Sequence, residues 1–416
     1  MAEMIPLVII GAGASGLMAA ATASLSGPVL LLEKEARAGR KLLATGNGRC
    51  NLLTLRPERA RLHGGGADAA WALMQKNPPR AVLQRFEAMG LCWREEAEGR
   101  VYPASGQAGA VLDVLRAACE RQGVRLRTGA EVLRLDRAQG GFRLHLADGE
   151  MLLARRVIMA GGGRAAPSFG ADGQVHRLLG ALGHPVTRLA PALSPLKLPP
   201  DRIRGLKGVR TQATLALEIA DRPAATERGE ALFTDYGISG VAAMQLSRRA
   251  GEALASGQSA RLAISLMTPE EASDQTALRA SLFSGATMEG YFTGLLHKRI
   301  GLCLLREAGL APDAPVTPDA ARRVQPLLAR WALPITGVLP FAHAQVTAGG
   351  LAMAAFCPET LESRLVPGLF ACGEALDVDG DCGGYNLLWA WVSGMVVGEA
   401  GMPGMEGTLG RCPRPC

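Results

Sequence analysis

A glycine turn near the N-terminus restricts the fold of this chain more than any other feature. The glycines occur as Gly11-x-Gly13-x-x-Gly16, after an apolar run and before an alanine-rich stretch. In this spacing the first glycine permits a tight turn, the second admits a pyrophosphate, and the third lets a helix pack closely on a strand. The pattern predicts a strand, a turn and a helix whose N-terminus, at Ala14 and Ser15, faces a dinucleotide.

A second apolar run ends at Glu33, 22 residues after Gly11, and Lys34 follows it. A carboxylate at the end of this strand is placed to accept hydrogen bonds from ribose hydroxyls. Its charge disfavours a ribose 2′-phosphate, so the site is predicted to hold FAD or NAD and not NADP.

The composition is that of a globular protein of more than one domain. The chain has 416 residues, of which 48% are hydrophobic and 20% charged, and 52 are glycine. Residues 4–32 carry no charge, but the glycines and Pro28 within them argue against a membrane span or a signal segment. The nine cysteines form no CxxC pair and the six histidines show no ligand spacing with them, so we expect no metal site. Reduced thiols and no export signal indicate a cytoplasmic protein.

The net charge of +7 carries little information about partners. Only six of the 45 basic residues are lysine, which is consistent with a coding bias toward arginine. A solvated surface is the simpler interpretation, although clustered cations can also attract a polyanion. Arg202, Arg204, Lys207 and Arg210 form one such basic run. Because only 4% of the residues are aromatic, a generic platform for single-stranded nucleic acid is disfavoured.

The order of apolar runs predicts an α/β fold interrupted by an insertion. Four prolines between residues 191 and 200 mark a boundary, and α/β patterning resumes after residue 345. We expect strands at 124–135, 141–146, 155–160, 209–219 and 261–267, a helix at 111–121, and further helices within 269–331.

Two further glycine-rich segments favour FAD over NAD. The segment 39–51 contains Gly39-Arg40-Lys41 and a glycine-rich loop that can span a pyrophosphate and reach a flavin ring. The segment 383–386 opens an apolar helix, whose backbone N–H groups can stabilise negative charge on the reduced flavin. An ordinary glycine-rich helix entry is the simpler alternative for this last segment.

A second fingerprint, Gly161-x-Gly163-x-x-Ala166, is interpreted differently. Pro167 and Gly170 interrupt the helix that it requires, and no acidic residue ends a following strand. We therefore expect a strand-end turn beneath the flavin, and an NAD(P)H that docks only transiently as electron donor.

The four motifs GRKLLATGNGRCN (39–51), LFTDYGISG (232–240), AQVTAGG (344–350) and GEALDVDGDCGGYNL (373–387) resemble the bacterial BaiN/YhiN flavoproteins over nearly the whole chain. The resemblance implies a Rossmann-like FAD domain formed by 1–190 and 346–416, a β-barrel-like insertion formed by 191–268 and 332–345, and a helical insertion at 269–331. Family members are associated with reduction of activated C=C bonds, including steroid enones and a uridine of ribosomal RNA.

The predicted cofactor site combines the residue patterns with this resemblance. Its members are Gly11, Gly13, Ala14, Ser15, Gly16, Glu33, Lys34, Gly39, Arg40, Lys41, Thr45, Gly46, Asn47, Gly48, Arg49, Asn51, Val132, Ala160, Gly161, Gly162, Gly373, Glu374, Asp377, Gly383, Gly384, Tyr385, Asn386 and Leu387.

The candidate catalytic residues are Arg49, Cys50 and Asn51, in the loop expected against the flavin ring. Cys50 can supply the proton that alkene reduction needs after hydride transfer, although a buried structural cysteine is the favoured alternative. Further candidates for the substrate side, each equally an ordinary packing residue, are Tyr236, Ser239, His343 and Gln345.

The sequence therefore predicts an FAD-dependent oxidoreductase, driven by NAD(P)H, that reduces a small enone or a uracil of ribosomal RNA. An oxidase using O₂ is the rival enzyme class, and a flavin-bearing RNA-binding or assembly factor is the rival without catalysis. The oligomeric state is left open.

Overall fold

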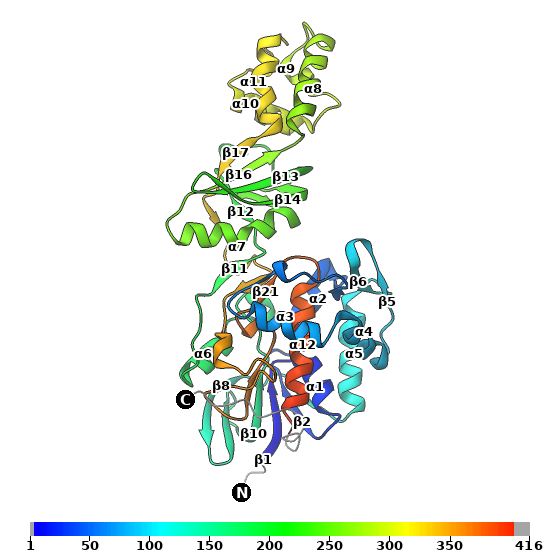
Figure 1. The fold of residues 1–416 in the computed structure, drawn as a ribbon, viewed down its shortest axis with the longest axis vertical. Helices are drawn as coiled ribbons and strands as arrows, with labels where there is room; N and C mark the ends of the chain where they lie inside the picture. The colour runs from blue at the N-terminus through cyan, green and yellow to red at the C-terminus, as the bar shows by residue number, and fades with distance from the viewer. Residues whose placement is uncertain (1–3, 403–416) are drawn as a thin grey trace. The chain divides into compact units, whose positions relative to one another are not determined.

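The computed structural model describes residues 4–402 and divides the chain into two compact units (Figure 1). Unit 1 contains residues 1–190 and 346–416, and unit 2 contains residues 191–345. The chain therefore leaves unit 1 once and returns to it. The last 14 residues of the expected FAD domain, with Cys412 and Cys416, lie outside the described residues.

Unit 1 is built on a mixed seven-stranded sheet. The strand order is β7-β2-β1-β10-β9-β8, and β20 also pairs with β10. Parallel pairing joins β7, β2, β1, β10 and β20, whereas β8 and β9 form an antiparallel hairpin. The bounds are β1 Met4–Ile10, β2 Val29–Leu32, β7 Arg125–Arg127, β8 Val132–Ala138, β9 Gly141–Leu146, β10 Met151–Met159 and β20 Leu369–Ala371. This parallel core is of the Rossmann type, as the sequence predicted.

The single strand expected over 124–135 is wrong: the chain forms β7 and β8 there, in different parts of the sheet. Gly129 lies between them with φ of +66°, a left-handed conformation that ends the extended run. Both halves alternate apolar and polar residues, so the side-chain pattern alone did not reveal the break.

The uncharged segment 4–32 forms the centre of unit 1. It folds into β1, the helix α1 (Ala14–Ala23) and β2, and nearly all of its apolar side chains are buried. Elements that are buried on every side have continuous apolar sequences. Among residues 4–402, no helix has the length and apolarity needed to cross a bilayer.

The helix α12 (Tyr385–Ala400) packs alongside α1, although the two are far apart in sequence (Figure 1). Small residues allow this close approach. A Cβ atom on Gly394 would lie 2.6 Å from the Ser15 carbonyl oxygen, and one on Gly398 would lie 2.7 Å from that of Ala19. The packing places Gly394, in the middle of α12, beside Ser15 at the beginning of α1, so the first turn of α12 extends past the glycine turn.

The remaining elements of unit 1 cover this core. The helices are α2 Arg40–Ala44, α3 Ala67–Lys76, α4 Pro79–Met89, α5 Ala108–Arg121 and α6 Gln174–Ala181. The short strands are β3 Leu53–Thr54, β4 Leu62–His63, β5 Trp93–Glu95, β6 Arg100–Pro103, β19 Val346–Ala348 and β21 Asp379–Gly380. A further short strand, β11 Ala190–Ala192, begins at the last residue of the first segment of unit 1 and continues into unit 2.

Unit 2 contains an antiparallel sheet covered by a long helix. The strand order is β17-β16-β13-β14-β15-β12-β18, and no ladder between the described residues joins the outer strands β17 and β18. The bounds are β12 Leu196–Lys197, β13 Arg210–Ile219, β14 Arg222–Phe233, β15 Gly237–Ser239, β16 Ala260–Ser265, β17 Trp331–Pro334 and β18 Gly337–Val338. The helix α7 (Val241–Ala255) buries Ala243 and Leu246 in the same apolar core as Phe233.

Between β16 and β17 lie four helices: α8 Pro269–Leu282, α9 Met288–Tyr291, α10 Lys298–Ala308 and α11 Pro318–Ala329. Their buried side chains, such as Tyr291 and Leu304, belong to the apolar core that also contains Trp331 of the sheet. Thr268 caps α8 with a capping box to Glu271, the expected way for a helix to begin after a strand.

Candidate functional site

The glycine turn has two glycines that packing requires and one that faces open space. A Cβ on Gly11, which has φ of +105°, would lie 2.5 Å from the Ala160 carbonyl oxygen. A Cβ on Gly16 would lie 1.8 Å from the Gly11 carbonyl oxygen. At Gly13 no described atom lies within 4 Å of the Cβ position. The space at Gly13 is therefore the part of the turn that a phosphate group can occupy.

Glu33 connects the glycine turn to the end of β2. Its Oε2 accepts a hydrogen bond from the Ala12 N–H at 2.8 Å, and its Oε1 accepts one from the Glu35 N–H at 2.9 Å. Each carboxylate oxygen can accept more than one hydrogen bond. Glu33 can therefore hold the turn and still accept from ribose hydroxyls.

A loop that the sequence analysis did not select lies beside this strand end. Lys34 Nζ is 3.0 Å from Asp172 Oδ1, and Arg40 forms an ion pair with Glu35 and donates to the Ser168 carbonyl at 2.8 Å. A cavity of about 400 Å³ adjoins the loop and is lined by Arg164, Asp172, Gly173, His176, Arg177, Val186 and Leu189. Asp172 follows no regular pattern, so sequence reasoning had no signal for it.

The second glycine-rich loop has an unusual backbone. Gly46, Asn47 and Gly48 all adopt left-handed conformations, with φ of 57°, 54° and 82°. Glycine and asparagine tolerate this region best, which explains the residue choice. The Arg49 guanidinium forms an ion pair with Glu96 and lies 4.3 Å from the centre of the Tyr102 ring.

Cys50 is fully buried at the end of this loop. Burial raises the pKa of its thiol to about 11, because the thiolate is poorly solvated there, and a hydrogen bond with Thr45 offsets part of this effect. The thiol is protonated near neutral pH. Its burial favours the packing alternative, and its catalytic role stays a prediction.

Lys41 and Glu374 join two of the predicted motifs. Lys41 Nζ lies 2.6 Å from Glu374 Oε2. Glu374 Oε1 accepts from the backbone N–H of Thr347 at 2.9 Å and from its hydroxyl at 2.7 Å. The Thr347 Oγ1 in turn accepts from the N–H groups of Arg164 and Ala165. Four distant segments thus meet at one polar network.

The same network explains the second glycine fingerprint. A Cβ on Gly163 would lie 2.4 Å from Thr347 Oγ1, so the glycine is needed for this contact. No helix follows directly: the chain makes a 3₁₀ turn at Pro167–Phe169 before α6. The turn at Ala160, Gly161 and Gly162 follows β10 at the carboxyl end of the parallel strands, beside Gly11.

Asn51 joins the second loop to the beginning of α12. Its side-chain nitrogen donates to the Leu53 carbonyl and its oxygen accepts from the Gly384 N–H, both at 3.2 Å. Gly384 has φ of +99°, and a Cβ there would lie 2.5 Å from the Leu53 carbonyl carbon. The next N–H groups, from Tyr385 to Leu387, belong to the first helical turn, where no intrahelical acceptor exists. They can donate to a ligand.

The other residues of the last motif stabilise the loop before α12. Asn386 exchanges two side-chain hydrogen bonds with the backbone of Gly380, at 2.9 and 2.7 Å. The Tyr385 hydroxyl accepts from the Glu58 N–H at 3.2 Å. Asp377 Oδ2 accepts from the Gly65 N–H at 3.0 Å. Tyr385, Asn386 and Asp377 are predicted cofactor contacts. In the structure their side chains bond to the backbone of neighbouring segments, and contact with the cofactor stays a prediction.

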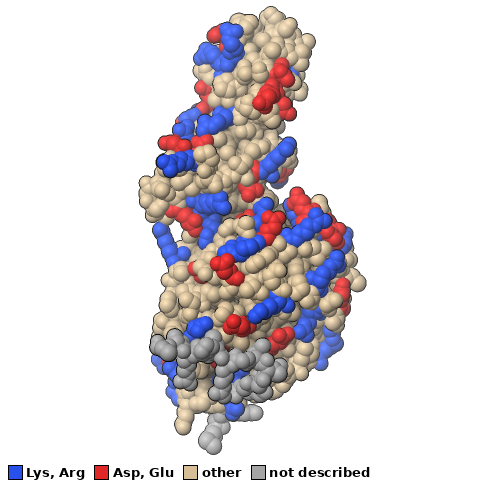
Figure 2. All heavy atoms as spheres, in the orientation of Figure 1, with Lys and Arg blue, Asp and Glu red and all other residues tan. Residues whose placement is uncertain are grey.

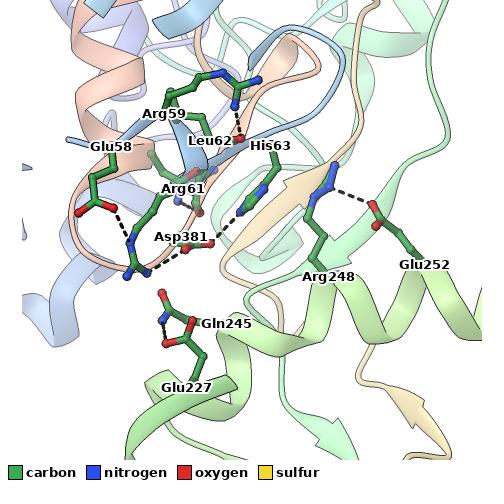
Figure 3. Close-up of polar contacts among 12 residues, drawn as sticks. Glu58, Arg59, Arg61, Leu62, His63, Glu227, Gln245, Arg248, Glu252 and Asp381 are labelled. Atoms are coloured by element: carbon green, nitrogen blue, oxygen red, sulfur yellow. Dashed lines mark hydrogen bonds and ion pairs between the residues drawn. The ribbon is translucent and has the colours of Figure 1, made fainter. Parts of the chain in front are cut away.

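Asp381 is a second carboxylate that the sequence analysis did not select, and it lies between Arg61 and His63 (Figure 3). Its Oδ2 accepts from Arg61 Nη1 at 3.1 Å, and its Oδ1 is 2.8 Å from His63 Nε2. Asp381 belongs to the motif 373–387, whereas His63 stands in a segment without any motif.

In unit 2 the proposed substrate-side residues are only partly grouped. The rings of Tyr236 and His343 lie 6.5 Å apart, and Gln345 Nε2 contacts the Met244 sulfur at 3.8 Å. Nearby on α7, Gln245 donates to Glu227 and Arg248 to Glu252 (Figure 3).

The basic run of unit 2 is largely compensated by carboxylates. Arg202 makes a bidentate pair with Glu307, Lys207 pairs with Asp235 at 2.8 Å, and Arg210 pairs with Glu230. On the face drawn in Figure 2, acidic side chains lie among the basic ones in the same way. Within residues 4–402, no cluster of three His, Cys, Asp or Glu side chains has the arrangement of a metal site.

The parallel sheet, the glycine turn and the position of Glu33 define a Rossmann-type dinucleotide-binding protein. More narrowly, residues 5–400 match the HI0933-like protein Rossmann domain family, and the chain belongs to it. The BaiN/YhiN resemblance is thereby confirmed. The family is one of FAD-dependent oxidoreductases, and the open space at Gly13, the carboxylate of Glu33 and the N-terminus of α12 fit that cofactor.

Two relatives match nearly the whole chain. A 3-dehydro-bile acid delta(4,6)-reductase of Clostridium scindens is 36% identical over 401 residues, which cover 94% of this chain and 98% of the relative. A ribosomal RNA dihydrouridine synthase of Escherichia coli is 28% identical over 411 residues, 94% and 96% of the two chains. Among solved structures, the fold is similar to a 3-ketosteroid-delta4-(5alpha)-dehydrogenase of Rhodococcus jostii, with a TM-score of 0.52, 17% identity and coverage of 96% and 97%.

Proposed function

We propose that this protein is an FAD-dependent reductase that takes hydride from NADH or NADPH and reduces an activated C=C bond of a small cyclic enone. The observation that carries the proposal is the end-to-end similarity to a bile acid reductase, at 36% identity. The paired basic run in unit 2 supports a small molecule over a polyanion, because each pair offsets a cation that a phosphate would need.

Different residues of unit 1 bind different parts of FAD. Gly13 leaves room for the pyrophosphate, and Glu33 accepts hydrogen bonds from the ribose of the adenosine half. Lys41, held in place by Glu374, supplies ammonium N–H donors at the centre of the site. The first turn of α12 offers N–H donors to the oxidised and, more strongly, to the reduced pyrimidine edge of the flavin.

When bound, FAD supplies a hydride at N5 to an electron-poor carbon. Asn51 fixes the loop that carries Arg49 and Cys50 against the beginning of α12. The ion pair with Glu96 and the contact with the Tyr102 ring fix the position of the Arg49 guanidinium in this loop. The seven described cysteines are free thiols, which is consistent with a reducing, cytoplasmic setting.

A uracil of ribosomal RNA is the second candidate substrate. Its C5=C6 bond is conjugated to a carbonyl group, so it is chemically an activated alkene. The relatives from Escherichia coli and Haemophilus influenzae, both named ribosomal RNA dihydrouridine synthases, favour it at 28% and 25% identity.

Anaerobic stopped-flow spectroscopy tests the proposal. The protein is reduced with NADH or NADPH and then mixed separately with a steroid enone, with ribosomal RNA, and with O₂. Rapid reoxidation by the enone supports the proposal. Reoxidation only by O₂ would indicate an oxidase, a two-dalton gain on a uridine would indicate the RNA reaction, and no reduction by either nicotinamide would contradict the proposed electron donor.

A further inference from the structure

His63, Asp381 and Arg61 form a polar cluster outside the set of predicted cofactor residues. Both oxygens of Asp381 are engaged, one by the Arg61 guanidinium and one by the imidazole of His63 (Figure 3). A carboxylate bonded to one ring nitrogen fixes the orientation of a histidine and determines which nitrogen carries the proton. Because an ionised carboxylate only accepts hydrogen bonds, the contact of Nε2 with Asp381 requires a proton on Nε2, and Nδ1 is the other ring nitrogen.

The backbone holds the cluster firmly in place. The strand β4 pairs with β21, so that His63 stands opposite Asp379, and the Asp381 N–H donates to the Arg61 carbonyl at 3.0 Å. Asn386 of α12 bonds to Gly380 of β21 at both its N–H and its carbonyl. The cluster is thereby tied to the first turn of α12.

His63 differs from the other candidate proton donor in exposure. Its side chain keeps 22% of its surface exposed, and that of Asp381 keeps 15%, whereas Cys50 is fully buried. The buried histidines of unit 1 have backbone or hydroxyl partners: His176 contacts the Ala375 carbonyl, and His184 contacts the Ser363 hydroxyl. His63 combines a carboxylate partner with access from outside.

We propose that His63, oriented by Asp381, is the proton donor of the reductive reaction, a role that rests on the proposed function. Hydride adds to one carbon of the C=C bond, and the electron pair of the broken π bond moves to the neighbouring carbon, giving an enolate. The Nδ1–H bond of the His63 imidazolium then breaks, and its proton forms the new C–H bond. His63 is left neutral, with Nε2–H still donated to Asp381, and takes up another proton from water. Asp381 is a positioning residue.

Several charged groups surround the histidine. Asp381 faces it directly, Arg61 faces Asp381, and Glu58 lies 4.0 Å from Arg61 Nε. Asp379 is its cross-strand neighbour, and it has a polar partner of its own. Removing Asp381 is therefore the change that alters the charge next to the ring most directly.

A second cluster of the same composition supplies a matched control. In the β8–β9 hairpin, His145 Nε2 lies 2.8 Å from Asp136 Oδ2, and Arg134 bonds to the same oxygen. The hydrogen bonds that join these three side chains lie within the β8–β9 hairpin. A loss of rate specific to His63 therefore cannot come from breaking a His–Asp pair as such.

The kinetic test follows the two half-reactions of His63→Gln and His145→Gln in the holoenzyme. His63→Gln is expected to slow enone reduction by about 10²- to 10⁴-fold, the usual size of general acid catalysis. Flavin reduction by NAD(P)H should change less than about threefold in both variants. Asp381→Asn should slow enone reduction by an intermediate factor.

If enone reduction in His63→Gln equals that in His145→Gln, the assignment of the proton donor is overturned while the proposed function stands. If the native protein reduces no enone, the proposed function itself fails.

The position of the proton on the His63 ring can be measured without turnover. Long-range ¹H–¹⁵N NMR of the histidine rings in the full chain identifies which nitrogen is protonated. The neutral ring of His63 is expected to carry its proton on Nε2 and to lose that preference in Asp381→Asn, whereas Asp136→Asn leaves it unchanged. A ring that carries its proton on Nδ1 when neutral would overturn the proposal.

Discussion

Lys41 Nζ lies 2.6 Å from Glu374 Oε2, and this contact joins residues 333 positions apart. Neither side chain is more than about one-third exposed, and Glu374 also binds Thr347 twice. The pair therefore connects the loop after the glycine turn to the segment before α12.

Replacing Lys41 with alanine should release FAD and destabilise unit 1. Glu374 would lose its charged partner in a half-buried site, at a cost of about 1.5 to 3 kcal/mol. Flavin absorbance after gel filtration and a thermal melt measure the two effects. Lys207→Ala, which breaks an exposed pair with Asp235, is the control and should change stability by less than about 1 kcal/mol. Full flavin retention in Lys41→Ala would contradict the assigned role.

Gly13→Val and Gly16→Val should both lose FAD, but for different reasons. The Cβ at Gly13 enters open space, so this variant should fold with a native circular dichroism spectrum and fail to retain flavin. The Cβ at Gly16 would lie 1.8 Å from a carbonyl oxygen, so this variant should yield little folded protein. A folded Gly13→Val protein with full FAD would place the pyrophosphate elsewhere.

Alkaline pH should destabilise the protein partly through Cys50. The pKa of this thiol is about 11 in the folded protein, against an ordinary value of 9.0. Above pH 9 the unfolded chain loses a proton that the folded protein keeps, so stability falls as the pH rises from 9 to 11, by about 2 to 3 kcal/mol. Urea unfolding at pH 8 and pH 10.5 measures the change. It should become smaller in Cys50→Ala but not in Cys92→Ala, because Cys92 is exposed.

Asn51→Asp should lower the reduction potential of the flavin by some tens of millivolts. The new carboxylate would stand at the beginning of α12, where negative charge is favourable for the helix but opposes the charge of a reduced flavin. Each 30 mV of a two-electron couple corresponds to about 1.4 kcal/mol. Redox titration with reference dyes checks this, with Asn77→Asp at the end of α3 as control.

Arg202→Ala should destabilise unit 2 and leave the affinity for RNA unchanged. The guanidinium already holds Glu307, whose side chain is only 10% exposed, so its loss leaves a carboxylate without its partner. In the sequence, attraction of a polyanion by the basic run is the alternative to a solvated surface, and that alternative predicts weaker RNA binding in Arg202→Ala. Thermal melts and the salt dependence of RNA binding, with exposed Arg204→Ala alongside, separate the two effects. A flatter salt dependence in Arg202→Ala would restore the RNA interpretation.

The sequence by itself determined the local elements of the cofactor site. The strand, turn and helix around Gly13 follow from spacing, because each glycine has a role within a few residues of its neighbours. The second fingerprint, at Gly161, is excluded as a nucleotide site for an equally local reason: Pro167 and Gly170 prevent the helix that it requires. The sequence motifs also predicted the family, and the family model matches residues 5–400.

Only the tertiary structure decided which side chains meet. Lys41 and Glu374, Asn51 and Gly384, and His63 and Asp381 are all more than 300 residues apart, and no periodicity relates them. Their contacts depend on α12 packing against α1 and on β21 pairing with β4. The position of a side chain in space is set by the packing of whole elements, whereas a sequence pattern reports only what neighbouring residues share.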